Sequence, residues 1–409
     1  MYQKFSLNWL VAILFPLAAI LWSCQNEPSR KMNEKKETRT EQTKPPSDSH
    51  LVFVGTYTRK ESFVNGKAKG IYVYEMDKKT GALKFVNQSP PTVNPTYLVV
   101  HPNGKYLYAV NEVGGDAANP TGSVSAFSID PVSKELKPLN SVSSHGVAPC
   151  YISLEQSGKY VLVANYVSGT VAMFPVLEDG TLGEAASVVQ HRGKGPHPRQ
   201  EGPHAHFIRN GPDNRFAYAA DLGLDKIMIY KMDLTKGQLI PAEPNAFAKT
   251  EAAAGPRQLA FHPNKHWVYE INELNGTIEA FQIDGATGAL HHFQTIRATE
   301  KRKGSDLGSA DIHITPSGKF LYASSRGDEN NIAMYSIDNQ SGKLSLIGFQ
   351  STLGKAPRNF AIDPSGTFLL VANQDTDNVV TFRIDPRSGK LMATGLQTKI
   401  LTPVCLKFW

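Results

Sequence analysis

The sequence predicts an all-β protein, a seven-bladed β-propeller closed by pairing of its N- and C-terminal strands in one blade. A motif of roughly 50 residues recurs along the chain, a length typical of one four-stranded propeller blade. Its intact copies begin at Pro95, Pro149, Pro203, Pro256, Ser309 and Pro357. A further copy is split between the chain ends, with residues 51–83 at one end and 403–409 at the other. Six intact copies and one split copy predict seven blades.

Four strands are expected in each blade, and the copy that begins at Pro95 shows them most clearly. They are residues 96–100, 105–111, 123–129 and 136–142. All four segments are rich in the β-branched, aromatic and aliphatic residues that half-buried strands favour. Turn-forming residues separate them, namely Pro102-Asn103-Gly104 after the first strand and Asp130-Pro131 after the third.

The split copy predicts how the ring closes. Residues 51–56, 71–76 and 83–87 supply its second, third and fourth strands but no first strand. Residues 404–408 at the other end of the chain have the composition of that missing strand. Pairing the two termini in one blade would remove the open sheet edges, so we expect the closure to stabilise the ring.

The N-terminal segment is predicted to lie outside the propeller. Residues 1–23 combine Lys4 with a long apolar run, as a secretion signal does. The sequence Leu21-Trp22-Ser23-Cys24 resembles the lipobox of bacterial lipoproteins, which implies that Cys24 is lipidated. Residues 24–49 are polar and charged and are expected to form a disordered tether to a propeller domain of residues 50–409. The protein is thus expected to be exported and lipid-anchored to a bacterial membrane, on the periplasmic side or at the cell surface; the alternative is an uncleaved membrane anchor.

Composition excludes some classes of partner. The formal net charge is +6, and Lys and Arg are scattered between Asp and Glu, with no basic helix or long basic run. We therefore expect no nucleic-acid partner, and membrane contact only through the lipid anchor. Only Cys150 and Cys405 remain in the propeller, which predicts buried thiols and not a disulfide framework.

Function is expected where the copies differ, at one mouth of the central channel. Neighbouring strands of a blade are antiparallel, so every first strand begins where every second strand ends. The residue that follows each blade-starting position is Thr96, Cys150, His204, Arg257, Ala310, Arg358 or Val404. This comparison predicts that His204, Arg257 and Arg358 lie at equivalent positions beside the channel.

The end of the second strand gives a second set of positions. Its last residue is Asn111, Asn165, Asp221, Asn272, Ser325 or Asn373, and this recurrence favours a structural role in the turn. The next residue varies among Glu112, Tyr166, Leu222, Glu273, Arg326 and Gln374. Arginines around a carboxylate and an imidazole suit a small anionic ligand, although a purely structural ion-pair cluster is the alternative.

The connection into the fourth blade is unusually rich in His, Arg and Gly. It reads HRGKGPHPRQEGPHAH from His191 to His206 and includes Arg199. No set of carboxylates accompanies these histidines to complete a zinc or calcium site, so we assign no metal and no cofactor. His206 is interpreted equally well as an interior residue or as a catalyst.

Several motifs together resemble one known family. They are PHAH at residues 203–206, GPRQLAFHP followed by VYEINEL at 255–274, DIHITPSGKFLYASSRG at 311–327 and PRNFAIDPSGTFLLVANQ at 357–374. These segments resemble the seven-bladed propeller lactonases, which include bacterial 6-phosphogluconolactonases of the propeller type and fungal carboxymuconate lactonising enzymes. The resemblance covers roughly residues 50 to 409. The signal sequence and tether are a departure from the cytosolic members.

The resemblance implies a catalytic site made of a histidine, two arginines and a glutamate. By motif these are His204 or His206, Arg257, Arg326 and Glu273. The implied reaction is hydrolysis of 6-phosphogluconolactone to 6-phosphogluconate, or of a related lactone outside the cytoplasm. Glu273 or His204 would act as the base and the arginines would stabilise the oxyanion. Further substrate contacts are expected from Arg358, Gln374, Arg199, Glu112 and Asn111.

Two other functions fit the sequence. One is a muconate-type cycloisomerase, which works in the direction of lactone formation. The other is a propeller without enzymatic activity that binds a small anionic ligand. A serine nucleophile is not expected, because the chain has no Gly-x-Ser-x-Gly elbow.

Overall fold

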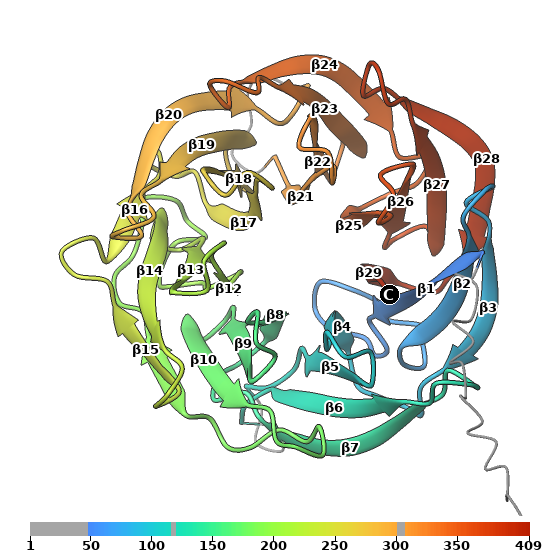
Figure 1. Ribbon diagram of the computed structural model, residues 1–409, viewed down its shortest axis with the longest axis horizontal. Coiled ribbons are helices and arrows are strands. Elements are labelled where there is room, and N and C mark those ends of the chain that lie inside the picture. The colour runs from blue at the N-terminus through green and yellow to red at the C-terminus, as the bar shows by residue number, and fades with distance from the viewer. Residues whose placement is uncertain (1–47, 116–119, 301–306) are drawn as a thin grey trace, which may run out of the picture. The chain divides into compact units, whose positions relative to one another are not determined.

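Seven antiparallel sheets surround a central axis and form one blade each (Figure 1). This computed structural model describes residues 48–115, 120–300 and 307–409. The predicted seven-bladed β-propeller is confirmed. The signal sequence, Cys24 and nearly all of the tether lie outside the described residues. No helix in the described part of the chain is long and apolar enough to cross a membrane.

The strands of each blade follow one another from the axis outward. Blade 1 contains β29 (Pro403–Phe408), β1 (Ser49–Thr56), β2 (Tyr72–Asp77) and β3 (Leu83–Gln88). Blade 2 contains β4 (Pro95–Val100), β5 (Tyr106–Asn111), β6 (Ser123–Ile129) and β7 (Leu136–Ser143). Blade 3 contains β8 (Pro149–Leu154), β9 (Tyr160–Asn165), β10 (Thr170–Pro175) and β11 (Ser187–Gln190).

Blade 4 has an additional strand, β16 (Phe247–Lys249), which pairs with β14. Its other strands are β12 (Arg209–Asn210), β13 (Phe216–Asp221), β14 (Lys226–Asp233) and β15 (Gln238–Pro241). Blade 5 contains β17 (Pro256–Phe261), β18 (Trp267–Asn272), β19 (Thr277–Ile283) and β20 (Leu290–Arg297). Blade 6 contains β21 (Ser309–Ile314), β22 (Phe320–Ser325), β23 (Asn331–Ile337) and β24 (Leu344–Ser351). Blade 7 contains β25 (Pro357–Ile362), β26 (Phe368–Asn373), β27 (Asn378–Ile384) and β28 (Leu391–Lys399).

The ring closes as the split copy predicts. Strand β29 pairs antiparallel with β1, with Phe53 opposite Lys407. The innermost strand of blade 1 therefore comes from the C-terminus, while the other three come from the N-terminal end of the described chain (Figure 1). This pairing satisfies backbone groups that would otherwise form two exposed sheet edges.

A recurring hydrogen bond links several blades to the blade that follows. A tyrosine in the second strand donates its hydroxyl hydrogen to a glycine carbonyl in the following blade, as from Tyr269 to Gly342 at 2.7 Å. The same bond runs from Tyr108, Tyr218 and Tyr322 to Gly180, Gly288 and Gly389. Gly342 has a φ of 71°, and a Cβ there would lie 2.5 Å from the Trp267 ring. Glycine is therefore required at this turn because the neighbouring blade packs directly on it.

The recurring asparagine at the end of the second strand is structural, as predicted. In blade 2 the Asn111 amide donates to the carbonyl of Val93 at 2.8 Å, and its oxygen accepts a hydrogen bond from Ser125 at 2.6 Å. It thus ties the end of β5 both to the segment entering the blade and to β6. Cys150 and Cys405 are buried free thiols, which confirms the expectation for them.

Blade 4 differs from the predicted register by two residues. The sequence predicts a copy that starts at Pro203. In blade 3 the starting residue, Pro149, pairs with Asn165 at the end of the second strand. In blade 4 the residue that makes the equivalent pairing, with Asp221, is Ala205. The regular inner strand is reduced to this single bridge and to β12. The PHAH sequence thus contains a proline that resembles the blade-starting residue but lies two positions before it. His206, and not His204, therefore occupies the position equivalent to Arg257 and Arg358.

Candidate active site

A cavity of about 720 Å³ opens where the inner strands begin and the second strands end. Most of its inner lining comes from two sets of positions in the repeat, one at the start of the inner strand and one just after the end of the second strand. Those that reach the cavity are Cys150, His206 and Arg358 from the inner strands and Glu112, Tyr166, Glu273 and Arg326 from the residue after the second strand. Arg199 reaches it from the connection into blade 4. Several of the positions at which the copies differ thus meet in one concave site.

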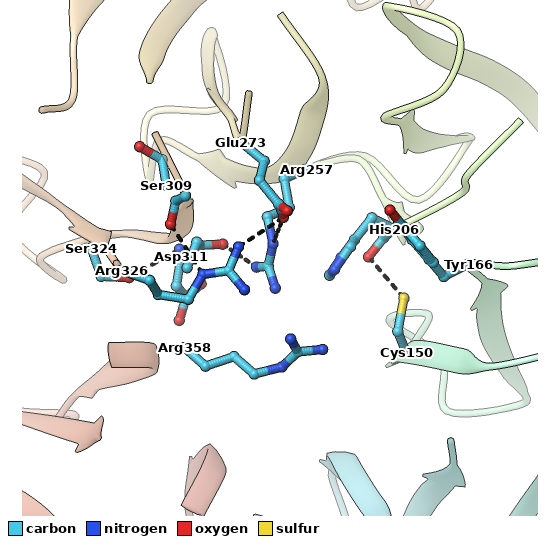
Figure 2. A network of polar contacts seen from close by, with 12 residues as sticks. Cys150, Tyr166, His206, Arg257, Glu273, Ser309, Asp311, Ser324, Arg326 and Arg358 are labelled. Carbon is cyan, nitrogen blue, oxygen red and sulfur yellow. Dashed lines mark hydrogen bonds and ion pairs between the residues drawn. The ribbon is translucent and has the colours of Figure 1, made fainter. Parts of the chain in front are cut away.

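Glu273 is the centre of a cluster that includes three arginines, and Figure 2 shows it with two of them, Arg257 and Arg326. Its Oε2 accepts a hydrogen bond from Arg257 Nε at 2.7 Å and forms an ion pair with Arg326 Nη2 at 3.0 Å. Its Oε1 accepts a hydrogen bond from Arg199 Nη2 at 2.7 Å. Burial acts to raise the pKa of the Glu273 carboxyl, but the attraction of the three arginines outweighs burial and holds this pKa well below its usual value. Glu273 is thus a fixed negative charge and a weak proton acceptor.

Arg257 lies deeper than the other two arginines of this cluster. Its side chain is 1% exposed and also donates a hydrogen bond to the carbonyl of Ala310. Burial and the nearby Arg326 lower the pKa of Arg257 to about 10, although Glu273 acts in the opposite direction. Arg257 lines a small hollow that adjoins the main cavity and does not line the main cavity itself. Its position suits support of the site more than direct contact with a ligand in the main cavity.

Arg358 occupies a different position from the Glu273 cluster. Its guanidinium extends toward the side of the cavity that holds His206 and Cys150 (Figure 2). Its Nη2 lies 3.6 Å from Glu112 Oε1, which also accepts a hydrogen bond from the Tyr57 hydroxyl at 2.8 Å. Burial acts to lower the pKa of Arg358, but Tyr57 and Glu112 raise it above its ordinary value. Arg358 is therefore a permanent cation whose ion pair leaves donors directed into the cavity.

The two histidines of the PHAH sequence have different surroundings. His204 stacks on Tyr166 at 4.7 Å, its Nδ1 lies 3.0 Å from the Tyr166 carbonyl oxygen and its Nε2 lies 3.2 Å from Glu201. His206 lines the cavity and its Nδ1 has no hydrogen-bond partner among the described residues. Burial, followed by the charge of Arg257, lowers the pKa of His206 well below its usual value. The imidazole of His206 is thus uncharged near neutral pH and faces the cavity.

Two of the expected substrate contacts lie outside the cavity lining. The Asn111 amide makes the structural hydrogen bonds described above, and Gln374 Nε2 donates to Asp375 Oδ1 at 3.0 Å. Neither residue lines the cavity. Both were predicted only from their place in the repeat. That place shows at which end of the channel a residue lies, but it does not show whether the side chain points into the cavity.

Sequence comparison also missed residues that shape the site. Tyr57 occupies in blade 1 the position that Glu112 and Glu273 occupy in theirs, so the same rule applied to the split copy would have found it. Tyr166 and Cys150 belong to the varying positions and line the cavity, but they carry no charge, so the sequence alone does not mark them as site residues. Phe63 lines the cavity from the loop after β1, is 62% exposed and contacts Tyr57 edge to face. No repeat or motif marks this loop residue.

The site has the components for ester chemistry on a small polar ligand. A neutral imidazole and two arginines, Arg326 and Arg358, face one cavity, while the rim carries the carboxylates of Asp328 and Glu329. A cavity of this size matches those that hold small ligands. The described part of the chain has no group of three or more His, Cys, Asp or Glu residues arranged to hold a metal ion.

Comparison with known proteins agrees with this architecture. The family model described as lactonase, 7-bladed beta-propeller, matches residues 51–408. The chain is 36% identical to a 6-phosphogluconolactonase of Bacillus subtilis over 88% of this chain and 98% of that protein. It is 37% identical to a 6-phosphogluconolactonase of Formosa agariphila over 79% of this chain and 89% of that one. The crystal structure of a periplasmic gluconolactonase of Pseudomonas aeruginosa superposes with a TM-score of 0.82 at 33% identity, covering 88% and 99% of the two chains. The protein belongs to the family of seven-bladed β-propeller lactonases.

Proposed function

We propose that the protein hydrolyses a sugar lactone in the cavity at the channel mouth. The observation that carries this proposal is the uncharged imidazole of His206 in the same cavity as the guanidinium groups of Arg326 and Arg358. Opening a cyclic ester requires a base for the attacking water and positive charge for the oxyanion that develops on the carbonyl. These groups supply both requirements within one buried site.

His206 is the base in this proposal, in preference to His204 or Glu273. Its Nε2 would accept a proton from water as the water oxygen attacks the lactone carbonyl carbon. The resulting imidazolium would return the proton to the ring oxygen as the carbon–oxygen bond breaks, which leaves the open-chain acid. Glu273 is less suitable because the three arginines hold its pKa very low. His204 is less suitable because contacts from Tyr166 and Glu201 occupy both of its ring nitrogens.

The arginines would divide the remaining work. Arg358 and Arg326 would donate hydrogen bonds to the carbonyl oxygen, where negative charge develops in the transition state. Arg257, held by Glu273 and the Ala310 carbonyl, would keep Glu273 in place and add positive potential. This division uses the residues that the family resemblance suggests, with Glu273 as an organiser of the arginines.

An unphosphorylated sugar lactone is the better candidate substrate. A neutral sugar lactone needs only hydrogen bonds from the mixed acidic and basic side chains that line the cavity, which include Asp328 and Glu329. Three of the four arginines at the site already share Glu273. Relatives named for both the phosphorylated and the plain lactone are found in the family.

We also propose that the chain is an exported lipoprotein anchored through Cys24. The apolar segment before Cys24, the polar segment after it and the similarity to a protein described as periplasmic support this location. Replacing Cys24→Ser should move the protein from the membrane fraction to a soluble fraction. Membrane retention of this variant would contradict lipid anchoring.

Lactone turnover with matched arginine variants tests the proposed activity. Residues 48–409 should open gluconolactone faster than the spontaneous reaction, and 6-phosphogluconolactone more slowly than the plain lactone. Arg358→Ala should lower kcat/KM by about 10²-fold or more, the usual effect of removing an oxyanion donor. Arg387→Ala, in the exposed turn after β27, serves as the matched control and should behave as the wild type. A wild-type rate equal to the spontaneous rate would refute the proposal, and lactone formation from a muconate-like acid would favour the cycloisomerase.

A further inference from the structure

A small hollow of about 10 Å³ adjoins the main cavity. It shares Glu112, Cys150, His206 and Arg358 with the main cavity, so the two spaces adjoin. Thr96 of blade 2 also lines it. A volume of this size corresponds to that needed by one water molecule.

Three residues that line this hollow each carry a buried side-chain atom with no hydrogen-bond partner among the described residues. These atoms are Thr96 Oγ1, Glu112 Oε2 and His206 Nδ1. The exposed fraction of these residues is 2%, 7% and 5%, so bulk solvent does not supply the partner. Buried polar groups in native proteins are nearly always hydrogen-bonded, and here three residues that line one space of the right size each carry such a group without a partner. Together they form a set of donors and acceptors that matches one water molecule.

We propose that this hollow is a binding site for a single water molecule that connects His206 to Glu112. The water would accept a hydrogen bond from His206 Nδ1–H, donate one to Glu112 Oε2 and exchange one with the Thr96 hydroxyl. The Glu112 carboxylate is already oriented for this contact, because the Tyr57 hydroxyl fixes its other oxygen at 2.8 Å. The inference rests on the proposed function, since it explains how His206 is prepared to act as the base.

The water would determine which nitrogen of His206 carries the proton. A hydrogen bond from Nδ1–H leaves the lone pair on Nε2, and the hydrogen bond made by one ring nitrogen decides the state of the other. When Nε2 takes a proton from the attacking water, the positive charge on the ring is partly balanced by Glu112 through the buried water. The buried water is not consumed, because the proton passes from Nε2 to the leaving ring oxygen. Glu112 is thus a positioning residue.

The environment of His206 makes such support necessary. Burial and the cation of Arg257 act against protonation of the ring and lower its pKa. The other groups that face His206 are Glu273, Arg358, Cys150, Tyr166 and Glu112. Of these, Glu112 lines the hollow together with His206 and has a carboxylate oxygen, Oε2, with no hydrogen-bond partner among the described residues.

A high-resolution crystal structure and ¹⁵N NMR of the histidine rings test the proposal without reference to turnover. The wild type should show density for a water within hydrogen-bond distance of the three atoms. Its His206 signal, assigned by its loss in His206→Asn, should report the Nδ1–H tautomer. Thr96→Val should lose the water and mix the two tautomers, whereas Thr96→Ser keeps the hydroxyl and should retain both features.

Kinetics then separate a positioning role from a merely structural one. Glu112→Gln and Thr96→Val should lower kcat by about threefold to tenfold with KM changed less than about twofold, because the relay affects proton transfer and not binding. Thr250→Val is the matched control, since Thr250 Oγ1 is likewise unpartnered among the described residues but lines neither space, and it should leave kcat unchanged.

Two results would overturn the water site. One is a wild-type structure without water between these atoms, and the other is an Nε2–H tautomer that the Thr96 and Glu112 variants do not alter. Failure of the proposed activity is a separate outcome. In that case the water and the tautomer would be observed while no lactone is opened above the spontaneous rate.

Discussion

Glu273→Gln tests the claim that one carboxylate holds the arginine cluster together. The substitution keeps the size of the side chain but removes the negative charge that Arg199, Arg257 and Arg326 share. Arg199 and Arg326 have side chains that are 37% and 20% exposed, so water partly replaces the lost partner. Arg257 is 1% exposed and would remain buried as an uncompensated cation. Removing one partner of a buried ion pair costs about 3–5 kcal/mol, and we expect a loss of stability in that range.

The expected pH dependence follows from the direction of the pKa shift. The pKa of Glu273 is lowered in the folded state, so its contribution to stability is fully present above the pKa of about 4.3 that it has in the unfolded chain. That contribution is lost as the pH falls below this value toward the folded-state pKa. The difference between the wild type and Glu273→Gln should therefore be largest near pH 7 and should shrink below about pH 4.

Urea unfolding followed by intrinsic fluorescence at pH 7 and pH 3.5 measures both effects. Glu178→Gln is a matched control, because Glu178 lies on the exposed turn after β10 and should change the free energy of unfolding by less than about 0.5 kcal/mol. A Glu273→Gln variant that unfolds within about 0.5 kcal/mol of the wild type at pH 7 would refute the reasoning.

Three further predictions concern pH, thiol reactivity and blade packing. Since burial and Arg257 lower the pKa of His206 well below the ordinary value of 6.5, the loss of kcat/KM on acidification should be centred below pH 6.5, after subtraction of the spontaneous rate. A decrease centred above pH 6.5 would contradict His206 as the base. Burial raises the pKa of the Cys150 thiol, so it should resist alkylation at pH 8 in the native state and react after unfolding; alkylation of native Cys150 would show that the cavity floor is open. Gly342→Ala should destabilise by about 2 kcal/mol, because the new Cβ meets the Trp267 ring at a positive φ. Gly285→Ala has open space around its Cβ and should have a small effect; equal thermal shifts in the two variants would contradict the packing argument.

The repeat made the fold predictable because each copy carries its own strand and turn residues. Strand β6 was predicted with its observed bounds, and the closing strand β29 was predicted to within one residue. These agreements have a simple cause, since alternating apolar residues and Gly or Pro turns act locally within each blade. Nonlocal closure was predictable because only the split copy lacked a first strand.

The candidate site was less predictable because it depends on register and on side-chain direction. Pro203 resembles a blade-starting residue, yet Ala205 makes the equivalent pairing, and this shift exchanged the positions of His204 and His206. Sequence comparison grouped the arginines with Glu273 but could not show that three of them share its carboxylate. The unpartnered atoms beside the cavity become visible only when neighbouring blades are assembled.

Comparison of His206→Asn with His204→Asn is the most direct test of the central claim, that lactone opening occurs at the cavity floor with His206 as the base. Both variants are measured for gluconolactone hydrolysis with the spontaneous rate subtracted. We predict that His206→Asn lowers kcat by about 10²-fold or more, whereas His204→Asn lowers it by less than about tenfold. A His206→Asn variant with the wild-type rate, or an equal loss in the two variants, would contradict the account.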